Sequence, residues 1–384
     1  MRGYVDRMRG RGLLVTLGVG FVALAAPAFA FAPFETYPLN ADGQAVAIAD
    51  VTGDKHADVL LTDQTRLFVF RGNAAGKLAK PVVYPTAGPG AIEFNDDVAV
   101  ADLNRDGRLD AAVSDKAGVQ VFLQRGGGFA APKTIALPVI GTSIAAADVN
   151  GDHRPDLVVS GRSDQDSSIT GLYVLANRRS GWQVQKVDVG WFSSIRLADI
   201  NGDGKLDIVP LPPGNVVPPS IRLYFGNGRG GFTRHDLQVG TENTDAPGAL
   251  VAGDVTGDGR TDLVFDNDAN KPWSHLAVMA GTGGGNFAAP TIYPSLDLAS
   301  AIAVADLNGD HRKDVVVLHG FKKLGVYYQS RNGTLGAEQL TDLPFDDRYD
   351  PNGVAVGRIG ADAQPDIAIA DDGYTKGLVV VRQT

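Results

Sequence analysis

Carboxylates at a fixed spacing are the residues of this chain with the most specific chemistry. The stretch Asp306-Leu-Asn-Gly-Asp-His-Arg-Lys-Asp314 carries oxygen-bearing side chains at its positions 1, 3, 5 and 9. Alternating oxygen donors on a tight loop can converge on one point, and position 7 can add its backbone carbonyl. Several hard oxygen ligands, most of them charged, suit Ca²⁺ better than a metal that prefers nitrogen or sulfur. We therefore expect such a stretch to be a calcium loop.

Six copies of this nine-residue pattern are intact and a seventh has decayed. The copies begin at residues 50, 102, 148, 199, 254, 306 and 358. The residues predicted to hold up to six Ca²⁺ ions are Asp50, Thr52, Asp54, His56, Asp58, Asp102, Asn104, Asp106, Arg108, Asp110, Asp148, Asn150, Asp152, Arg154, Asp156, Asp199, Asn201, Asp203, Lys205, Asp207, Asp254, Thr256, Asp258, Arg260, Asp262, Asp306, Asn308, Asp310, Arg312 and Asp314. The seventh copy has Arg358 and Gly360 in place of the first two ligands, so we expect no calcium there. Arg358 could instead reach Asp362 or Asp366 and stand in for the ion.

A plain aspartate-rich turn is the alternative for each loop, because a short carboxylate can accept hydrogen bonds from its own backbone. That alternative explains one or two carboxylates per loop but not three, since like charges about 4 Å apart repel by about 4 kcal/mol at an effective dielectric constant of about 20. A bound cation removes this repulsion. Position 6 should need a left-handed backbone, which glycine adopts freely. We expect weaker sites where Lys55, His153 and His311 occupy that position.

The segments around each loop are predicted to be short antiparallel strands. Small apolar residues precede the loop, as in Ala301–Ala305, and a β-branched run follows it, as in Asp314–Leu318. Two further runs with a glycine-rich turn between them complete a unit of about 50 residues. No stretch of the mature chain has sustained helical periodicity. One four-stranded sheet cannot bury both faces, but seven around an axis can, so we predict an all-β, seven-bladed β-propeller.

The last blade should be closed by the beginning of the mature chain. Only three strands fit around the seventh copy, and Phe31–Tyr37 resembles Phe287–Tyr293, an internal fourth strand with its lead-in. A linear stack of sheets would expose unpaired edges at both ends, whereas an N-terminal strand in the last blade closes the ring. We therefore assign residues 31–384 to a single propeller domain.

The first thirty residues are predicted to be a secretory signal peptide. Four arginines precede an apolar run from Leu13 to Ala26, and Ala28-Phe29-Ala30 is a small-x-small cleavage signal. Cleavage is expected after Ala30, the alternative being an uncleaved signal anchor. No other stretch approaches the length of a membrane span. We therefore expect an exported protein, secreted or periplasmic, and a monomer.

Composition disfavours several other classes. The chain has 35 Lys and Arg against 44 Asp and Glu, and the net charge of −9 disfavours a nucleic-acid partner. The absence of cysteine excludes disulfide scaffolds, thiolate zinc sites and thiol nucleophiles. Removal of residues 1–30 shifts the net charge to −12, which six Ca²⁺ ions would cancel.

The repeated residues resemble the FG-GAP/VCBS repeat, found in integrin α-chain propellers and in many secreted bacterial proteins. The resemblance is carried by AVADLNGDHRKDVVVL, residues 303–318, and YFGNGRGGF, residues 224–232, and covers residues 31–384. It implies a calcium-binding propeller of the secreted bacterial type, with the ion between the first and second strands of each blade. It does not determine an activity, because members include adhesion modules, sugar-binding lectins and carriers of appended enzymes.

The sequence carries few motifs that are typical of enzymes. Gly226–Gly231 fits the pattern GxGxxG but joins two strands and opens no helix, and the patterns HExxH and GxSxG do not occur. Because aspartate is abundant, paired acids for glycoside chemistry stay open. A carbohydrate-active lyase or hydrolase on a propeller scaffold is therefore one alternative, and a purely structural envelope repeat protein is another.

Variable loops on one face favour a binding module. The glycine-rich turns share a face with the aspartate loops and are uniform, whereas the loops of the other face differ in length and content. A rigid scaffold carrying variable loops is a common recognition design. Trp191, Trp273 and Tyr349 in these loops could stack on sugar rings or anchor a peptide, the alternative being packing between blades. We expect a non-catalytic, lectin-like recognition or adhesion module for a glycan or protein ligand.

Overall fold

The computed structural model describes residues 34–86, 97–163, 165–211, 220–240, 247–267, 272–297, 299–320, 322–344, 353–360, 364–371 and 376–383. The predicted signal peptide, its cleavage site and Tyr349 lie outside these ranges. Within them, no helix has the length and apolar character needed to span a bilayer.

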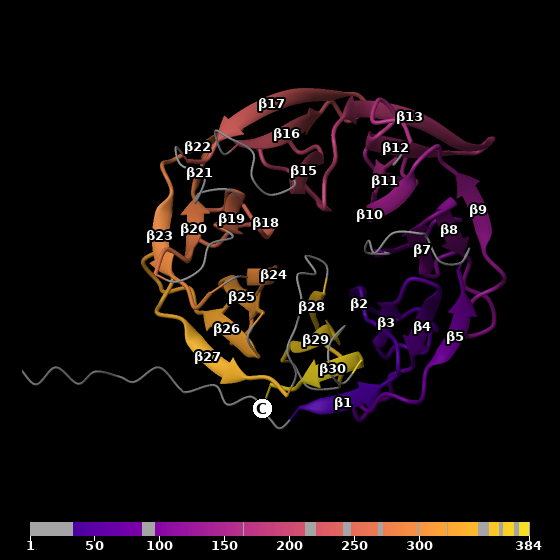
Figure 1. Cartoon of the computed structure of the whole chain (residues 1–384), viewed down its shortest axis with the longest axis horizontal. Helices are drawn as coiled ribbons and strands as arrows, with labels where there is room; N and C mark the ends of the chain where they lie inside the picture. The colour runs from indigo at the N-terminus through magenta and orange to yellow at the C-terminus, as the bar shows by residue number, and fades with distance from the viewer. Residues whose placement is uncertain are drawn as a thin grey trace, which may run out of the picture.

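Seven four-stranded antiparallel sheets surround a central axis as the blades of a propeller, which confirms the predicted fold (Figure 1). Blade 1 contains β2 (Ala45–Ala49), β3 (Asp58–Thr62), β4 (Arg66–Phe70) and β5 (Val82–Pro85). Blade 2 contains β6 (Val98–Ala101), β7 (Asp110–Asp115), β8 (Gly118–Phe122) and β9 (Lys133–Ala136). Blade 3 contains β10 (Ile140–Ala147), β11 (Asp156–Arg162), β12 (Gly171–Arg178) and β13 (Gly181–Val189). Blade 4 contains β14 (Ser194–Ala198), β15 (Asp207–Leu211), β16 (Ser220–Gly226) and β17 (Phe232–Gln238).

The remaining blades follow the same order from the axis outwards. Blade 5 contains β18 (Leu250–Gly253), β19 (Asp262–Asp266), β20 (His275–Met279) and β23 (Thr291–Pro294), with a small extra hairpin of β21 (Gly281–Gly283) and β22 (Asn286–Phe287). Blade 6 contains β24 (Ala299–Ala305), β25 (Asp314–His319), β26 (Lys323–Tyr327) and β27 (Gln339–Asp342). Blade 7 contains β28 (Val354–Gly357), β29 (Asp366–Asp371), β30 (Gly377–Val381) and β1 (Glu35–Pro38).

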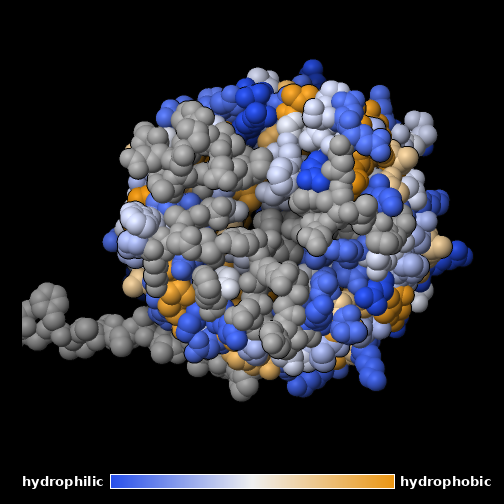
Figure 2. All heavy atoms as spheres, in the orientation of Figure 1, coloured by the Kyte–Doolittle hydropathy of each residue, from blue (hydrophilic) through white to orange (hydrophobic). Residues whose placement is uncertain are grey.

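Burial changes across each blade as the residue types predict. The second strands are buried along all or nearly all of their length, as in β3 and β25. The outermost strands are largely exposed, as in β5 and β23. Figure 2 shows hydrophilic side chains over much of the visible rim, with hydrophobic side chains in smaller patches between them. The core therefore lies between adjacent blades.

The ring is closed by strands from the two ends of the described chain, as predicted. β1 pairs antiparallel with β30, with Glu35 opposite Val380 and Tyr37 opposite Leu378. Side chains of blade 1, such as Phe70, share one buried cluster with Ile359 and others of blade 7. The seam between the first and last blades is therefore packed like the other blade boundaries.

A buried carboxylate ties three blades together near the axis. The innermost strands line a central cavity of about 450 Å³. Asp97 in its wall accepts hydrogen bonds from Ser143 Oγ at 2.8 Å and Ile144 N at 3.1 Å. Ser143 Oγ in turn accepts one from Ile195 N at 3.1 Å. Burial raises the pKa of Asp97, and the nearby charge of Arg196 only partly offsets this rise.

Candidate functional site

Each intact aspartate loop connects the first and second strands of its blade. Residues 50–58 lead from β2 into β3, and residues 306–314 lead from β24 into β25. The ninth position is therefore the first residue of the buried second strand. These loops and the turns between the third and fourth strands share one face of the ring, which we call the aspartate-loop face. We call the opposite face the variable-loop face.

The carboxylate at position 1 closes the loop over its own backbone. Asp50 Oδ1 accepts hydrogen bonds from Gly53 N at 2.7 Å and Asp54 N at 3.1 Å, and its Oδ2 accepts one from Lys55 N at 2.8 Å. At position 5, Asp54 Oδ1 accepts one from His56 N at 2.9 Å. These bonds are those of an aspartate-rich turn.

The carboxylate at position 9 anchors the loop to the body of the blade. Asp58 Oδ2 accepts hydrogen bonds from Val51 N at 3.0 Å and Thr52 N at 2.9 Å, and its Oδ1 accepts one from Gly72 N at 3.0 Å. Six carboxylates at this position are fully buried, namely Asp58, Asp110, Asp156, Asp207, Asp262 and Asp314. Burial raises the pKa of each of them. For Asp314 burial, helped by the charges of Asp310 and Asp306, raises the pKa to about 6.

One expectation about the plain turn is wrong. All three carboxylates of a loop accept hydrogen bonds from main-chain N–H groups, so a turn without metal accounts for three and not only for two. Over the described ranges, no group of three or more acidic or histidine side chains is placed to hold a metal ion. The case for calcium therefore depends on the other oxygens of the loop.

Position 3 carries oxygens that lack a partner in three loops. Thr52 Oγ1, Asn104 Oδ1 and Thr256 Oγ1 are buried and make no hydrogen bond of ordinary geometry, although the Thr52 and Thr256 hydroxyls lie near enough to Asp58 and Asp262 to favour their charged forms. A buried polar atom without a partner is unfavourable, and a cation would give these oxygens one. The Thr52 hydroxyl also lies beside Asp58 and partly offsets the rise of its pKa, so positions 3 and 9 converge. The residues present therefore fit an oxygen-coordinated ion.

In four loops a basic side chain at position 7 pairs with the carboxylate at position 5, whereas Arg154 bonds to Asn177 instead. Only the carbonyl of position 7 was predicted to act, but Arg108 Nη2 lies 2.6 Å from Asp106 Oδ2 and Lys205 Nζ lies 3.0 Å from Asp203 Oδ2. The hydrogen bond from Arg108 lowers the pKa of Asp106. The sequence does carry a signal for this unpredicted pairing, because a basic residue occupies position 7 in five of the six loops.

Two positions of the loop have a left-handed backbone. Position 6 was predicted to need one, and Lys55, His153 and His311 do have φ angles of 72°, 61° and 66°. Position 4 has one as well, with φ 74° at Gly257 and 65° at Arg105. The glycine at position 4 in five of the six loops is the sequence feature that could have indicated this left-handed backbone. Arg105 is the exception, and its side chain makes the left-handed backbone unfavourable there.

A cation stands beside the last carboxylate of the decayed seventh loop, but it is not the expected one. Arg382 Nη1 lies 2.8 Å from Asp366 Oδ2, whereas Arg358 is exposed and Asp362 lies outside the described residues. Arg382 Nη2 also lies 3.3 Å from Glu35 Oε2 and donates to the Gly76 carbonyl. Arg382 follows β30, so the pattern of the loop itself could not indicate it.

The two tryptophans of the variable-loop face have different surroundings. Trp273 is 67% exposed. It precedes His275, which lines a cavity of about 510 Å³ between blades 4 and 5 together with Gln238, Phe265 and Ile292. Trp191 is half-buried, and the Arg162 guanidinium lies over its ring at 5.7 Å. Packing therefore accounts for Trp191 better than for Trp273.

Comparison with known proteins agrees with the repeat and with the ring. Residues 50–113 and 102–159 match the FG-GAP-like repeat. No curated protein matches the chain. Among solved structures, an Agrocybe aegerita lectin, described as recognising non-reducing terminal N-acetylglucosamine, is 21% identical with a TM-score of 0.55 over 78% of this chain and 81% of that chain. BBS1N, solved in complex with ARL6DN and soaked with lead or with mercury, is 13% identical with a TM-score of 0.60 over 93% of this chain and 97% of that chain. At these identities the likeness shows the fold alone.

Proposed function

The chain carries FG-GAP-like repeats and folds as a seven-bladed β-propeller, and from this premise we propose that it is an exported, calcium-stabilised recognition module. It binds a glycan or protein ligand on its variable-loop face and catalyses no reaction. The proposal has two parts, the ion and the ligand, which separate experiments test.

The unpartnered oxygens at position 3 support calcium in the aspartate loops. Positions 1, 3, 5 and 9 and the carbonyl of position 7 would hold the ion in each intact loop. When bound, calcium supplies positive charge that offsets the repulsion among the carboxylates. The chain's own residues keep the loop closed by their hydrogen bonds to the main chain, so the loop is formed before the ion arrives.

Thermal melting with calcium and with EDTA tests the ion. Ligand at ~100 times its dissociation constant stabilises by about 2.7 kcal/mol per site, so calcium should raise the melting temperature clearly. The variant Thr256→Val should behave differently in the two buffers. With EDTA it removes a hydroxyl that makes no hydrogen bond of ordinary geometry, so the melting temperature should change little. With calcium it removes a ligand of the ion, so the stabilisation by calcium should be smaller. Equal melting of the parent protein in both buffers would refute calcium as a stabilising ion.

The exposed indole of Trp273 is the observation that carries the recognition role. A large aromatic side chain exposed to water, two residues before the cavity-lining His275, is suited to stacking on an apolar sugar face or a peptide side chain. The likeness to a lectin makes N-acetylglucosamine-terminated glycans sensible probes, together with a broad glycan and peptide array. Trp273→Ala should abolish binding without changing the melting temperature. Trp191→Ala, the control, should lower the melting temperature and leave binding intact. Binding that survives in Trp273→Ala would contradict this site.

A further inference from the structure

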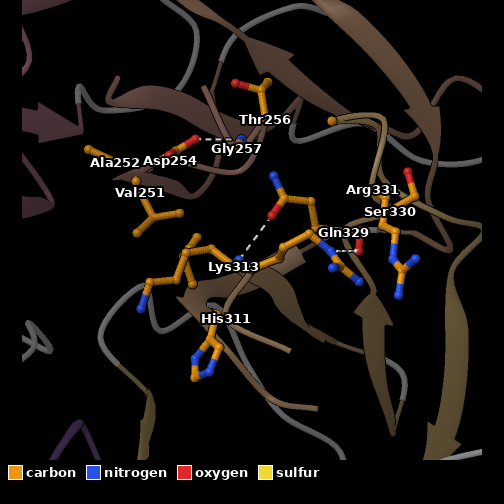
Figure 3. A pocket seen from close by; sticks show the side chains of 14 residues that line it. Val251, Ala252, Asp254, Thr256, Gly257, His311, Lys313, Gln329, Ser330 and Arg331 are labelled. Carbon is orange, nitrogen blue, oxygen red and sulfur yellow. Dashed lines mark hydrogen bonds between the residues drawn. The ribbon is translucent and has the colours of Figure 1, made fainter. Parts of the chain in front are cut away.

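A polar cavity lies between blades 5 and 6 on the aspartate-loop face (Figure 3). Its volume is about 450 Å³, and its walls come from the loops that follow β18 and β24 and from the turn after β26. The turn packs closely on the neighbouring blade, because a Cβ at Gly333 would lie 2.4 Å from the Thr256 carbonyl oxygen. The cavity is therefore a fixed feature of the blade boundary.

Uncompensated positive charge lines this cavity although the chain is acidic. His311, Lys313 and Arg331 are exposed and belong to its lining. Among the residues that the structure covers, Lys313 and Arg331 have no ion-pair partner. The acidic residue of the lining, Asp254, already accepts hydrogen bonds from Gly257 N at 2.6 Å and from a second N–H of its loop. The cavity therefore presents two free cations to a ligand.

Gln329 adds a buried donor that lacks an acceptor. This side chain is 2% exposed, and its Oε1 accepts a hydrogen bond from Lys313 N at 3.1 Å. Its Nε2 has no partner in the described part of the chain. In the corresponding place of blade 2, Gln124 donates its Nε2 to the Thr52 carbonyl at 2.9 Å. Figure 3 shows the Gln329 amide between Lys313 and His311 on one side and Arg331 on the other. An oxygen acceptor bound here would supply the missing partner.

We propose that this cavity binds the anionic group of an acidic saccharide, either the carboxylate of a uronic acid or a sulfate ester. The Gln329 amide can donate to an oxygen of such a group, and the two cations of the lining supply the opposite charge. The volume exceeds that of a bare oxyanion, and Val251, Ala252 and Val304 offer an apolar wall to a sugar ring. The net charge of −9 opposes long polyanions, which favours a short saccharide over a nucleic acid. This second site goes beyond the proposed recognition role, since it lies on the opposite face and needs no part of Trp273.

Calorimetric titration of the full chain tests the site with defined probes. The probes are digalacturonate, a sulfated galactose disaccharide, neutral galactobiose, inorganic sulfate and a short glutamate-containing peptide. We expect saturable binding of the two acidic saccharides and none of galactobiose. Lys313→Ala combined with Arg331→Ala should weaken that binding about tenfold or more, because it removes the two unpaired positive charges of the lining. Both side chains are exposed, so the variant should fold normally.

The groove between blades 3 and 4 supplies a matched control. Arg229 lines it and Arg179 lies in the turn after β12 on the same face; both are exposed, and Arg179→Ala combined with Arg229→Ala changes the net charge by the same amount. This control should keep the affinity for digalacturonate within about twofold. Gln329→Met should weaken binding, whereas Gln124→Met should not, although both remove a buried amide.

Three results would overturn the proposal. One is an equal loss of affinity in the two double variants, which would show general charge attraction. Another is binding of sulfate or of the peptide without binding of either acidic saccharide. The third is the absence of any saturable binding. The titrations are run in calcium and in EDTA and should succeed in both, so a failure of the calcium proposal leaves this test intact.

Discussion

Replacing Arg382 by methionine should destabilise the ring at its seam. Arg382 contacts Asp366 of β29, Glu35 of the closing strand β1 and the Gly76 carbonyl of blade 1. Burial opposes the charged form of Glu35, but hydrogen bonds from Tyr37 and Lys77 and the charge of Arg382 outweigh it and lower the pKa of this carboxyl. The arginine is thus the shared cation of two acids in different strands.

The size of the effect follows from burial. The side chains of Arg382 and Asp366 are 15% and 1% exposed, so removal of the arginine leaves a buried carboxylate without its cation. Breaking such a pair costs about 3–5 kcal/mol, and the partial exposure of Arg382 favours the lower value, about 3 kcal/mol. With an unfolding entropy of about 2.1 cal/mol/K per residue, this corresponds to a fall in melting temperature of about 4 °C.

Urea unfolding and thermal melting of a double-mutant cycle provide the assay. Asp366→Asn in the Arg382→Met background should recover part of the loss, because no buried charge is then left unpaired. The control is Arg108→Met, whose pair with Asp106 is exposed at 48% and 30% and should contribute little, because water screens it. If Arg382→Met lost no more stability than Arg108→Met, the stabilising role of Arg382 between β1, β29 and blade 1 would be refuted.

Three further outcomes are expected. In EDTA, the pKa of Asp314 is raised to about 6, so the folded state holds this proton more tightly than the unfolded state does. The free energy of unfolding, measured in urea at several pH values, should therefore fall as pH rises from about 4 to about 6. A rise would contradict the direction of the pKa shift. Gly333→Ala should destabilise more than Gly126→Ala by urea unfolding, because both have positive φ, 80° and 63°, but only the first Cβ meets the neighbouring blade. His319→Leu should lower the free energy of unfolding by about 3 kcal/mol, because the His319 Nε2 lies 2.6 Å from a Glu338 oxygen in a buried pair. The added change Glu338→Leu should restore part of that stability. Equal stability of His319→Leu and the parent protein would exclude the pair as a stabilising contact.

The repeat explains why the fold could be predicted from sequence. Seven copies of one loop at nearly equal spacing determine the number of blades, and the similarity of Phe31–Tyr37 to an internal strand indicates where the ring closes. The hydrogen bonds of each loop are also local, since Asp50 bonds to residues within five positions. Spacing along the chain carries this information directly.

Contacts between residues that are far apart in the sequence could not be predicted in the same way. Glu35 and Arg382 are 347 residues apart, and no spacing rule joins them. The pairing of His319 with Glu338 depends on how β25 lies against the segment before β27 in blade 6, and the free amide of Gln329 depends on how blade 6 packs on blade 5. The signal peptide, Tyr349 and the bound ion stay predictions.

The pairing of β1 with β30 has a kinetic consequence. In every other blade the third and fourth strands follow each other along the chain, whereas in blade 7 they come from segments more than 300 residues apart that must meet through diffusion. The conformational entropy lost on closing so long a span is large. The docking of β1 should therefore be the latest event in refolding and the earliest to reverse. Amide protons of residues 35–38 and 377–381 should exchange with deuterium faster than those of β3 or β25. The β1–β30 pair should therefore be the first part of the ring that a protease can attack.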